Sequence, residues 1–453
     1  MSLKHYDPRE YGAAGDGKKL DTAAIQAAID DCFAHGGGYV VLDTGTYLSG
    51  TIFLKSNVYL SIGAGAVLKA SPDIADYAEN VHYNRYVNEP ELDRAFIYAE
   101  DCVNIGIVGD GEINGSAEAF PNPGSIYRPM ALRFLRCKNI KLSGLKLYDS
   151  AAWTTAFLDS EDIWIDGLDI YNDKRYNGDG LDFDGCRNVY VSNCSITGTD
   201  DNFCLQSSSK EYPVKNIHVS NCRFSSICAA VRIGLKSIGS ISDVVISSCT
   251  FENVMREGVK IECTEGGNIS DIIISGLVMH NVRRPIFIIL NNRLDVIGSS
   301  IGLTEVPEIG TLERVTIRDV IAVDGEEMEE TQYRFGDDIM GEPKFNGIRV
   351  DANKDYPIRD LTLKDIHYTA IGGVKLSDIP SEYPIVEDMR FSDKKDTEVS
   401  ENYNPTWSRA AFMDIRNVDG LTLSGMYFRS IKADERPSAI IENCRRYDGC
   451  DFN

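Results

Sequence analysis

Acidic residues that could do chemistry gather in two short segments of the chain, 177–182 and 199–202. Asp179 in the first segment and Asp200 in the second are 21 residues apart, and Asp201 follows directly. If the chain returns to the same face after about one such interval, the three carboxyl groups meet. Carboxyl groups crowded in this way cannot all ionise easily, so at least one keeps a proton near neutral pH. A protonated and an ionised carboxyl side by side are the pair that acid–base cleavage of a glycosidic bond requires.

The same residue types also form turns, and this is the plain alternative. Asp and Asn side chains hydrogen-bond their own backbone, so the corners of repeat folds use them freely. A single Asp in such a place would be assigned to a turn, but three acids at this interval, two of them adjacent, favour chemistry. Asp182 and Asp184 alternate along a predicted strand, and we assign them a structural or supporting role.

A short sequence repeat would bring the acids together. Its phrase is an Asn or Asp, an aliphatic residue, any residue and a second aliphatic residue, followed by a small polar residue or Gly. Successive copies between Asn139 and Asp271 start 23, 26, 28, 27 and 28 residues apart. The phrase occurs at 104–107, 139–142, 162–165, 188–191, 216–219, 243–246 and 271–274, with weaker copies at 315–317, 361–363 and 421–423.

Each repeat holds two or three short strands with period-two alternation, rich in Val and Ile and separated by Gly, Asn, Asp and Ser. No long amphipathic helix interrupts them, which excludes the helical solenoids. Repeats this small can bury an apolar face only by stacking on one another. The sequence therefore predicts an all-β fold, a single-stranded right-handed parallel β-helix of about ten coils spaced roughly 4.8 Å apart.

The N-terminal region supplies a predicted cap for the end of this solenoid, where the apolar interior would otherwise be exposed. Asp21 is the expected N-cap of a helix over about 22–34, and the glycines at 36–38 would end it. The apolar stripe of this helix consists of Ile25, Ala28, Ile29, Cys32 and Phe33.

We expect one β-helix domain over residues 1–453, with a cap region over 1–60 and coils from about 60 to the end. Long insertions follow residue 290, notably 291–307 and 324–346. Insertions on a solenoid usually lie on one face and often build the binding cleft. Insertions that block one end of the cleft would favour exo-action on short chains.

Charge and composition limit the classes of binding partner that we expect for this protein. The chain has 46 basic and 69 acidic residues, a formal net charge of −23, so it repels nucleic acids and anionic membranes. The first residues lack the apolar stretch of a secretory signal, which favours a cytoplasmic protein or one exported with its leader removed. The 12 cysteines are too dilute for a disulfide scaffold, and neither they nor the 6 histidines have metal-ligand spacing.

Several segments resemble the polygalacturonase family, glycoside hydrolase family 28, among the pectin-lyase-like β-helix proteins. The stretches 12–17, 21–29 and 36–40 are similar to the family's opening. Residues 177–182, Asn-Gly-Asp-Gly-Leu-Asp, match the family's Asn-Thr-Asp-Gly-Ile-Asp, and 199–201 match its Gly-Asp-Asp. The resemblance covers most of the chain and implies a glycoside hydrolase acting on pectin-derived or related oligosaccharides.

Residue by residue, the resemblance implies Asp200 as general acid, with Asp179 and Asp201 holding the attacking water as general base. It implies inversion at the anomeric carbon, which needs carboxyl groups roughly 6.5 to 9.5 Å apart. Asn177, at the start of the first motif, is then a substrate-binding residue. This chemistry requires no metal and no cofactor.

Two family motifs are changed in this chain. Ala229 stands where the family has a histidine, and Lys260-Ile261-Glu262 stands where it has Arg-Ile-Lys, so the second base has become an acid. Gln206 corresponds to a family lysine. Glu262 would repel a uronate carboxylate and could accept hydrogen bonds from sugar hydroxyls, which favours a neutral or differently oriented sugar. Arg232 and Lys260 are the basic residues at motif positions. We expect four residues of these segments to bind substrate: Gln206, Arg232, Lys260 and Glu262.

Two other functions stay open from the sequence. One is a polysaccharide lyase or uronate epimerase on the same fold, which would need a basic residue to abstract a proton. The other is a non-catalytic carbohydrate-binding β-helix, which the missing histidine and the changed basic motif allow. The sugar, the linkage and the oligomeric state cannot be read from the sequence.

Overall fold

The computed structural model describes residues 4–79, 85, 93–121, 128–291, 308–325, 334–335, 338–339, 347–379 and 408–449. The chain forms two compact units, each described by itself. Unit 1 comprises Met1–Asn202 with Asn216–Cys222, and unit 2 comprises Phe203–Lys215 with Arg223–Asn453. Of the two predicted insertions, 291–307 and 324–346, the structure describes only residues 291, 324–325, 334–335 and 338–339.

Strands dominate both units. Up to Ser207 they are β1 His5–Tyr6, β2 Asp16–Leu20, β3 Gly38–Ser49, β4 Ile52–Phe53, β5 Val58–Ala70, β6 Ala95–Glu100, β7 Val103–Gly109, β8 Glu112–Asn114, β9 Met130–Leu135, β10 Lys138–Ser143, β11 Lys146–Tyr148, β12 Thr155–Leu158, β13 Glu161–Asp166, β14 Asp169–Tyr171, β15 Leu181–Asp184, β16 Arg187–Ser192, β17 Ser195–Gly198 and β18 Phe203–Ser207. They continue with β19 Val214–Ser220, β20 Arg223–Ser226, β21 Val231–Ser237, β22 Ser240–Cys263, β23 Asn268–Leu290, β24 Thr311–Val323, β25 Arg334–Phe335, β26 Asp338–Ile339, β27 Ile348–Ala352, β28 Ile358–Gly372, β29 Met413–Arg416, β30 Val418–Lys432 and β31 Ala439–Glu442. One α-helix, α1 Thr22–Ala34, and short 3₁₀ turns at Pro8–Tyr11, Ile74–Asp76, Ala117–Ala119 and Leu376–Asp378 complete the described elements.

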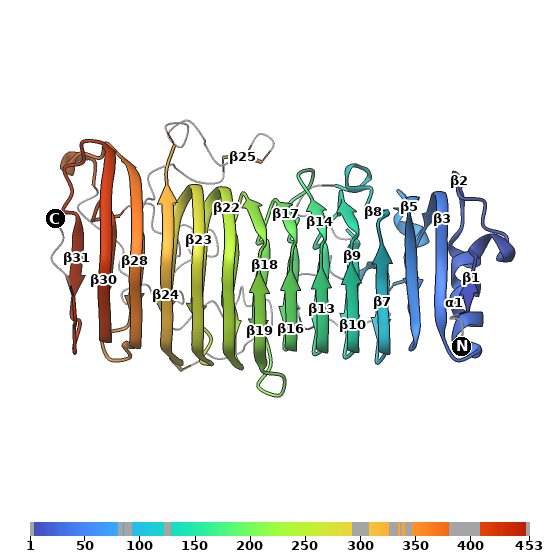
Figure 1. Ribbon diagram of the computed structural model, residues 1–453, viewed down its shortest axis with the longest axis horizontal. Coiled ribbons are helices and arrows are strands. Elements are labelled where there is room, and N and C mark those ends of the chain that lie inside the picture. The colour runs from blue at the N-terminus through green and yellow to red at the C-terminus, as the bar shows by residue number, and fades with distance from the viewer. Residues whose placement is uncertain are drawn as a thin grey trace. The chain divides into compact units, whose positions relative to one another are not determined.

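In unit 1 the strands stack as parallel ladders on three faces. One face consists of β7, β10, β13 and β16, which lie side by side in Figure 1. A second consists of β8, β11, β14 and β17, and a third of β6, β9, β12 and β15. The chain visits each face once per coil, so the right-handed parallel β-helix predicted from the repeat is confirmed.

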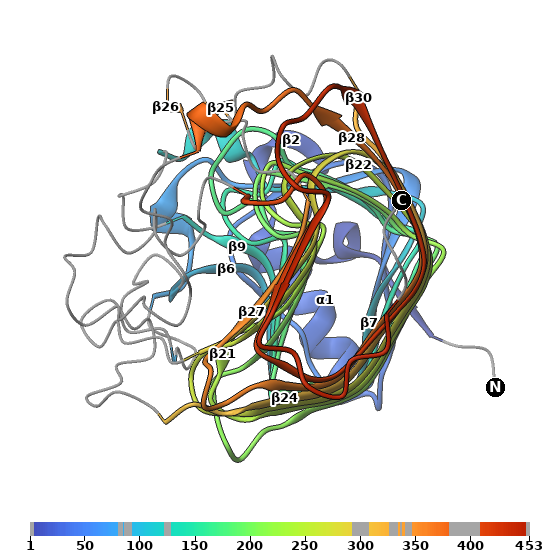
Figure 2. The ribbon, with the colours of Figure 1, turned by 90° about the vertical axis from the view of Figure 1, so that its left-hand side faces the viewer.

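Unit 2 follows the same plan with longer strands that bend around the corners of the coil. β22, β23, β24, β28 and β30 pair in that order, and β23, β27, β29 and β31 pair beside them. Figure 2 shows these coils end-on, with β27 on one wall and β28 on another. The weaker repeat copies lie in β24, β28 and β30, where their aliphatic residues face the core.

The repeat phrase also explains how each coil turns. Its first residue has a left-handed backbone in every strong copy, with φ near 58° at Asn139 and 56° at Asn188. Asn and Asp tolerate this conformation better than other residues with a side chain. Their side chains then bond from rung to rung, as when Asn139 Nδ2 donates to Asn104 Oδ1 at 2.6 Å.

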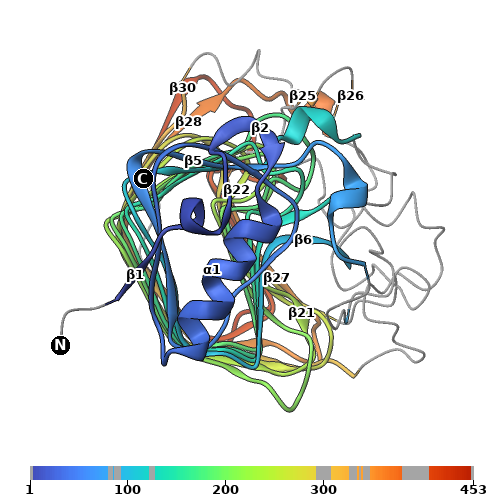
Figure 3. The same ribbon diagram turned by 90° about the vertical axis from the view of Figure 1, so that its right-hand side faces the viewer.

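Helix α1 covers the first coils of unit 1 (Figure 3), as predicted for a cap. Its buried residues include Ile25, Ile29 and Cys32, but one detail of the prediction is wrong. Phe33 is 46% exposed, because the apolar face ends one position earlier, and its ring packs under the Lys55 ammonium at 5.4 Å.

The predicted N-cap of α1, Asp21, is confirmed. It occupies the N-cap position of α1, but its carboxylate makes no capping hydrogen bond to the helix. It accepts instead from Ala14 N at 2.7 Å and Gly15 N at 3.0 Å, because the preceding loop folds back and presents two N–H groups to it. Among the described residues, no helix is long and apolar enough to span a membrane.

Candidate active site

The rung spacing brings the two acidic segments of unit 1 together. Gly180 N donates to the Asp201 carbonyl at 3.0 Å, and Gly178 N donates to Thr199 Oγ1 at 3.0 Å. These bonds join the turn before β15 to the turn one coil later. Asp179 therefore lies on the rung next to the Asp-Asp pair, as the 21-residue interval predicts.

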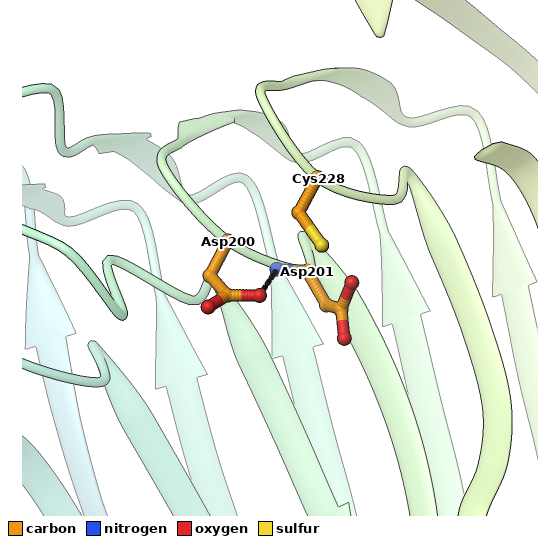
Figure 4. A group of neighbouring side chains, drawn as sticks. All are labelled: Asp200, Asp201 and Cys228. Carbon is orange, nitrogen blue, oxygen red and sulfur yellow. Dashed lines mark hydrogen bonds between the residues drawn. The ribbon is translucent and has the colours of Figure 1, made fainter. Parts of the chain in front are cut away.

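Asp200 and Asp201 present their carboxyl groups at the same corner. The two side chains have carboxylate oxygens within 4.8 Å of each other. This is shorter than the roughly 6.5 to 9.5 Å expected above for inversion, which therefore rests on the family resemblance. The Asp201 N–H donates to Asp200 Oδ1 at 2.9 Å, which fixes the turn between them (Figure 4). Asp201 is 2% exposed, whereas Asp200 is less buried.

Asp179 is the acid most strongly biased towards holding a proton. It is 5% exposed, and its burial raises the pKa of its carboxyl well above the ordinary value. The negative charges of Asp200, Asp182 and Asp201 raise this pKa further. The three predicted acids therefore interact electrostatically, and Asp182 joins them as a fourth member that the sequence analysis treated only as supporting.

Asp200 has the opposite environment. Its Oδ1 accepts the Asp201 N–H, and its Oδ2 accepts a bond from Asn177 Nδ2 at 3.4 Å. N–H donors directed at both oxygens stabilise an ionised carboxylate. The site thus combines a buried carboxyl whose pKa is raised with a less buried carboxyl that accepts hydrogen bonds from two N–H donors.

Asn177 is held by a residue that the sequence analysis missed. Arg128 Nη2 donates to Asn177 Oδ1 at 2.6 Å, and Arg128 Nη1 donates to the Tyr176 carbonyl at 2.6 Å. Arg128 is about 50 residues upstream in the chain and belongs to no motif, so no sequence signal marks it.

In unit 2, three predicted substrate-binding residues lie together. Arg232 and Lys260 occupy neighbouring rungs of β21 and β22. Arg232 Nε donates to Glu262 Oε2 at 2.9 Å, and Lys260 Nζ lies 3.4 Å from Glu262 Oε1. Glu262 therefore forms ion pairs with both Arg232 and Lys260.

These three side chains differ in how far they are buried. Lys260 and Glu262 are 1% and 0% exposed, whereas the Arg232 side chain is 15% exposed. Lys260 also lies 3.6 Å from Glu257 Oε2, so two acids neutralise it. Gln206, on β18, is 8% exposed and donates from Nε2 to Cys204 Sγ at 3.3 Å. Their roles in binding substrate remain predictions.

A parallel β-helix with a cluster of carboxyl groups at a strand-end corner defines the class of this protein. Residues 67–302 match the family described as Glycosyl hydrolases family 28, and the chain belongs to this family. The resemblance seen in the motifs is confirmed.

Proteins of similar sequence agree with this family membership. A probable polygalacturonase of Vitis vinifera is 27% identical over 263 residues, covering 52% of this chain and 52% of the relative. An exo-poly-alpha-D-galacturonosidase of Dickeya chrysanthemi is 27% identical over 292 residues, covering 52% of this chain and 48% of the relative. The chain thus spans about half the length of these relatives.

Solved structures support the fold. The family 28 exopolygalacturonase of Yersinia enterocolitica superposes with a TM-score of 0.74 at 18% identity, covering 100% of this chain and 80% of the other.

Proposed function

We propose that this protein is a glycoside hydrolase that cleaves pectin-derived or related oligosaccharides with inversion at the anomeric carbon. The observation that carries the proposal is the coupled cluster of carboxyl groups, in which buried Asp179 favours a proton and Asp200 and Asp201 present oxygens within 4.8 Å of each other. Hydrolysis of a glycosidic bond uses one carboxyl in each protonation state. Family membership and the descriptions of the two relatives support the substrate class.

In the proposed mechanism Asp200 is the general acid. Its proton passes to the glycosidic oxygen while the bond from that oxygen to the anomeric carbon breaks. Asp179 and Asp201 hold a water molecule, which loses a proton to them and forms the new bond to carbon from the opposite face. The net reaction adds one water to the glycoside and returns the proton to the carboxyl cluster.

In the free protein we expect the proton on Asp179 rather than on Asp200, because burial raises the pKa of the Asp179 carboxyl. Carboxyl groups this close titrate as one coupled group. We therefore place the proton on Asp200 only in the reacting complex. Movement of this proton from Asp179 to Asp200 protonates the general acid. It also leaves Asp179 ionised, so that Asp179 can orient the water.

Exo-action is part of the proposal. The Dickeya chrysanthemi relative is described as an exo-acting enzyme. Short oligosaccharides should then be shortened from one end, with a single small product accumulating from the first minutes of reaction. An even spread of intermediate lengths would instead indicate endo-action.

Substitution of Asp200 by Asn tests the assignment. Reducing-sugar release should be measured on pectic, rhamnogalacturonan and neutral oligosaccharides, with product lengths followed by anion-exchange chromatography. We expect kcat to fall by roughly 10²- to 10⁴-fold, the usual contribution of a general acid, with substrate binding retained. Asp173→Asn, at a side chain 39% exposed near the same turn, is the matched control and should leave turnover unchanged.

Three outcomes would contradict the proposal. Undiminished turnover in Asp200→Asn would remove its acid role. Ultraviolet absorbance from an unsaturated uronate, or release of an epimerised chain without cleavage, would show that the protein is a lyase or an epimerase. Binding without any turnover in the wild-type protein would make it a carbohydrate-binding β-helix.

A further inference from the structure

Arg128 joins three successive turns of unit 1. The residue stands just before β9, and β9, β12 and β15 are consecutive rungs of one face. Its guanidinium donates to the Ala151 carbonyl at 3.2 Å, in the turn before β12, and to the Tyr176 carbonyl at 2.6 Å, in the turn before β15. The side chain is only 1% exposed, so it acts inside the protein.

The contact with Asn177 sets the orientation of an amide. A guanidinium only donates hydrogen bonds, so the atom of Asn177 that faces Arg128 at 2.6 Å must be the amide oxygen. The amide nitrogen then faces Asp200, 3.4 Å from its Oδ2. Without the guanidinium, the Asn177 amide could rotate and present its oxygen to the carboxyl group instead.

The two orientations have opposite effects on Asp200. An N–H group directed at the carboxyl stabilises its ionised form, whereas a carbonyl oxygen there repels the ionised form. Asn177 also has a left-handed backbone, with φ of 54°, so its side chain depends on the turn that Arg128 ties down. Arg128 therefore influences both where the Asp200 carboxyl lies and how tightly it holds a proton.

We propose that Arg128 is a positioning residue that acts through the Asn177 amide on the Asp200 carboxyl. The inference rests on the proposed hydrolase function. Arg128 does not touch the sugar in this scheme, so its loss should lower kcat much more than it changes KM. The loss should amount to roughly 10- to 100-fold, as expected when a reacting group is slightly misplaced.

The pH profile separates positioning from plain structural support. If Asp200 is the general acid, activity falls as pH rises and the acid loses its proton. In Arg128→Met the N–H donor to Asp200 is no longer fixed, so the proton is held to higher pH. The basic limb of the kcat profile should move to higher pH, and Arg128→Lys, which can still donate to Asn177, should move it back part of the way.

Arg175→Met is the matched control. Arg175 also clamps loops of unit 1, donating to the Phe120 carbonyl at 2.5 Å and the Glu118 carbonyl at 2.8 Å. These bonds bypass Asn177. Its loss should lower the melting temperature and leave the basic limb in place.

A double-mutant cycle completes the test. If Arg128 acts through Asn177, then Arg128→Met combined with Asn177→Ala should be no slower than Asn177→Ala alone. Independent losses that multiply, or an unmoved basic limb in Arg128→Met, would overturn this inference and leave the hydrolase proposal standing. A wild-type protein that hydrolyses none of the tested oligosaccharides would overturn both.

Discussion

Asp324 in unit 2 should make stability depend on pH. It lies directly after β24, is 2% exposed, and its Oδ2 accepts bonds from Ile371 N at 3.0 Å and Tyr368 Oη at 3.2 Å. Burial raises its pKa from 3.8 to about 7 despite these donors. Ionising this carboxyl in the folded protein is therefore unfavourable.

The sign and size follow from linkage. Because the folded pKa lies above the unfolded one, the contribution of Asp324 is most favourable below about pH 4 and is lost as pH rises to about 7. A shift of about 3 units corresponds to about 4 kcal/mol in total. Between about pH 5 and about pH 8 the expected loss from Asp324 is about 2 to 3 kcal/mol. Buried acids of unit 1, such as Asp159 with a pKa raised to about 6, also titrate in this window, so the difference between the wild-type protein and the Asp324→Asn variant isolates the contribution of Asp324.

Urea unfolding followed by far-ultraviolet circular dichroism at several pH values measures this loss. Asp324→Asn keeps the shape and an acceptor oxygen but cannot ionise, so its stability should vary less with pH. It should exceed the wild-type protein in stability at about pH 8. Asp243→Asn, at a side chain 47% exposed, is the control and should keep the wild-type pH dependence. An Asp324→Asn curve parallel to the wild-type curve at every pH would refute the argument, because Asp324 would then be ionised throughout.

Two further predictions concern packing in unit 1. Phe157 is stacked between Phe134 and Phe183 with ring centroids 5.0 Å apart on each side, so Phe157→Ala should lower the free energy of unfolding by about 3 to 5 kcal/mol, measurable by thermal or urea unfolding. Gly180 has no room for a side chain, since a Cβ there would lie 2.3 Å from the Asn202 carbonyl oxygen. Gly180→Ala should displace the turn that carries the first acid and reduce kcat by about tenfold or more, with near-native circular dichroism; unchanged kcat would show that the turn tolerates the shift.

The fold could be predicted because the sequence repeat determines the register in which successive strands pair. A period-two pattern fixes which side chains face the core, and a nearly constant repeat length fixes which residues share a column from rung to rung. The placement of Asp179 beside Asp200 needed nothing more than this register. The first residue of the phrase shows how local chemistry and fold agree, because Asn and Asp are the residues that a left-handed corner tolerates.

The contacts that could not be predicted are those made by long side chains, whose rotamers the sequence does not determine. Arg128 spans two rungs to meet Asn177, and no sequence interval encodes the rotamer that does so. The ion pairs of buried Glu262 with Arg232 and Lys260 were likewise not predicted from the sequence, and its role in binding substrate remains a prediction. The Phe33 error has the same origin, since the edge of an apolar stripe is decided by what lies opposite it.

Crowding of like charges at the site is a direct result of the fold. Neighbouring rungs lie roughly 4.8 Å apart, so acids at one corner of successive coils must interact strongly. Crowding of this kind is enough by itself to favour retention of a proton in the cluster. The same crowding would spread the proton over all the acids, unless some groups were biased. Burial biases Asp179 towards the proton, and the Asn177 amide, turned by Arg128, biases Asp200 away from it. In the proposed mechanism this difference keeps the proton on Asp179 in the free protein, and Asp200 receives it as general acid only in the reacting complex.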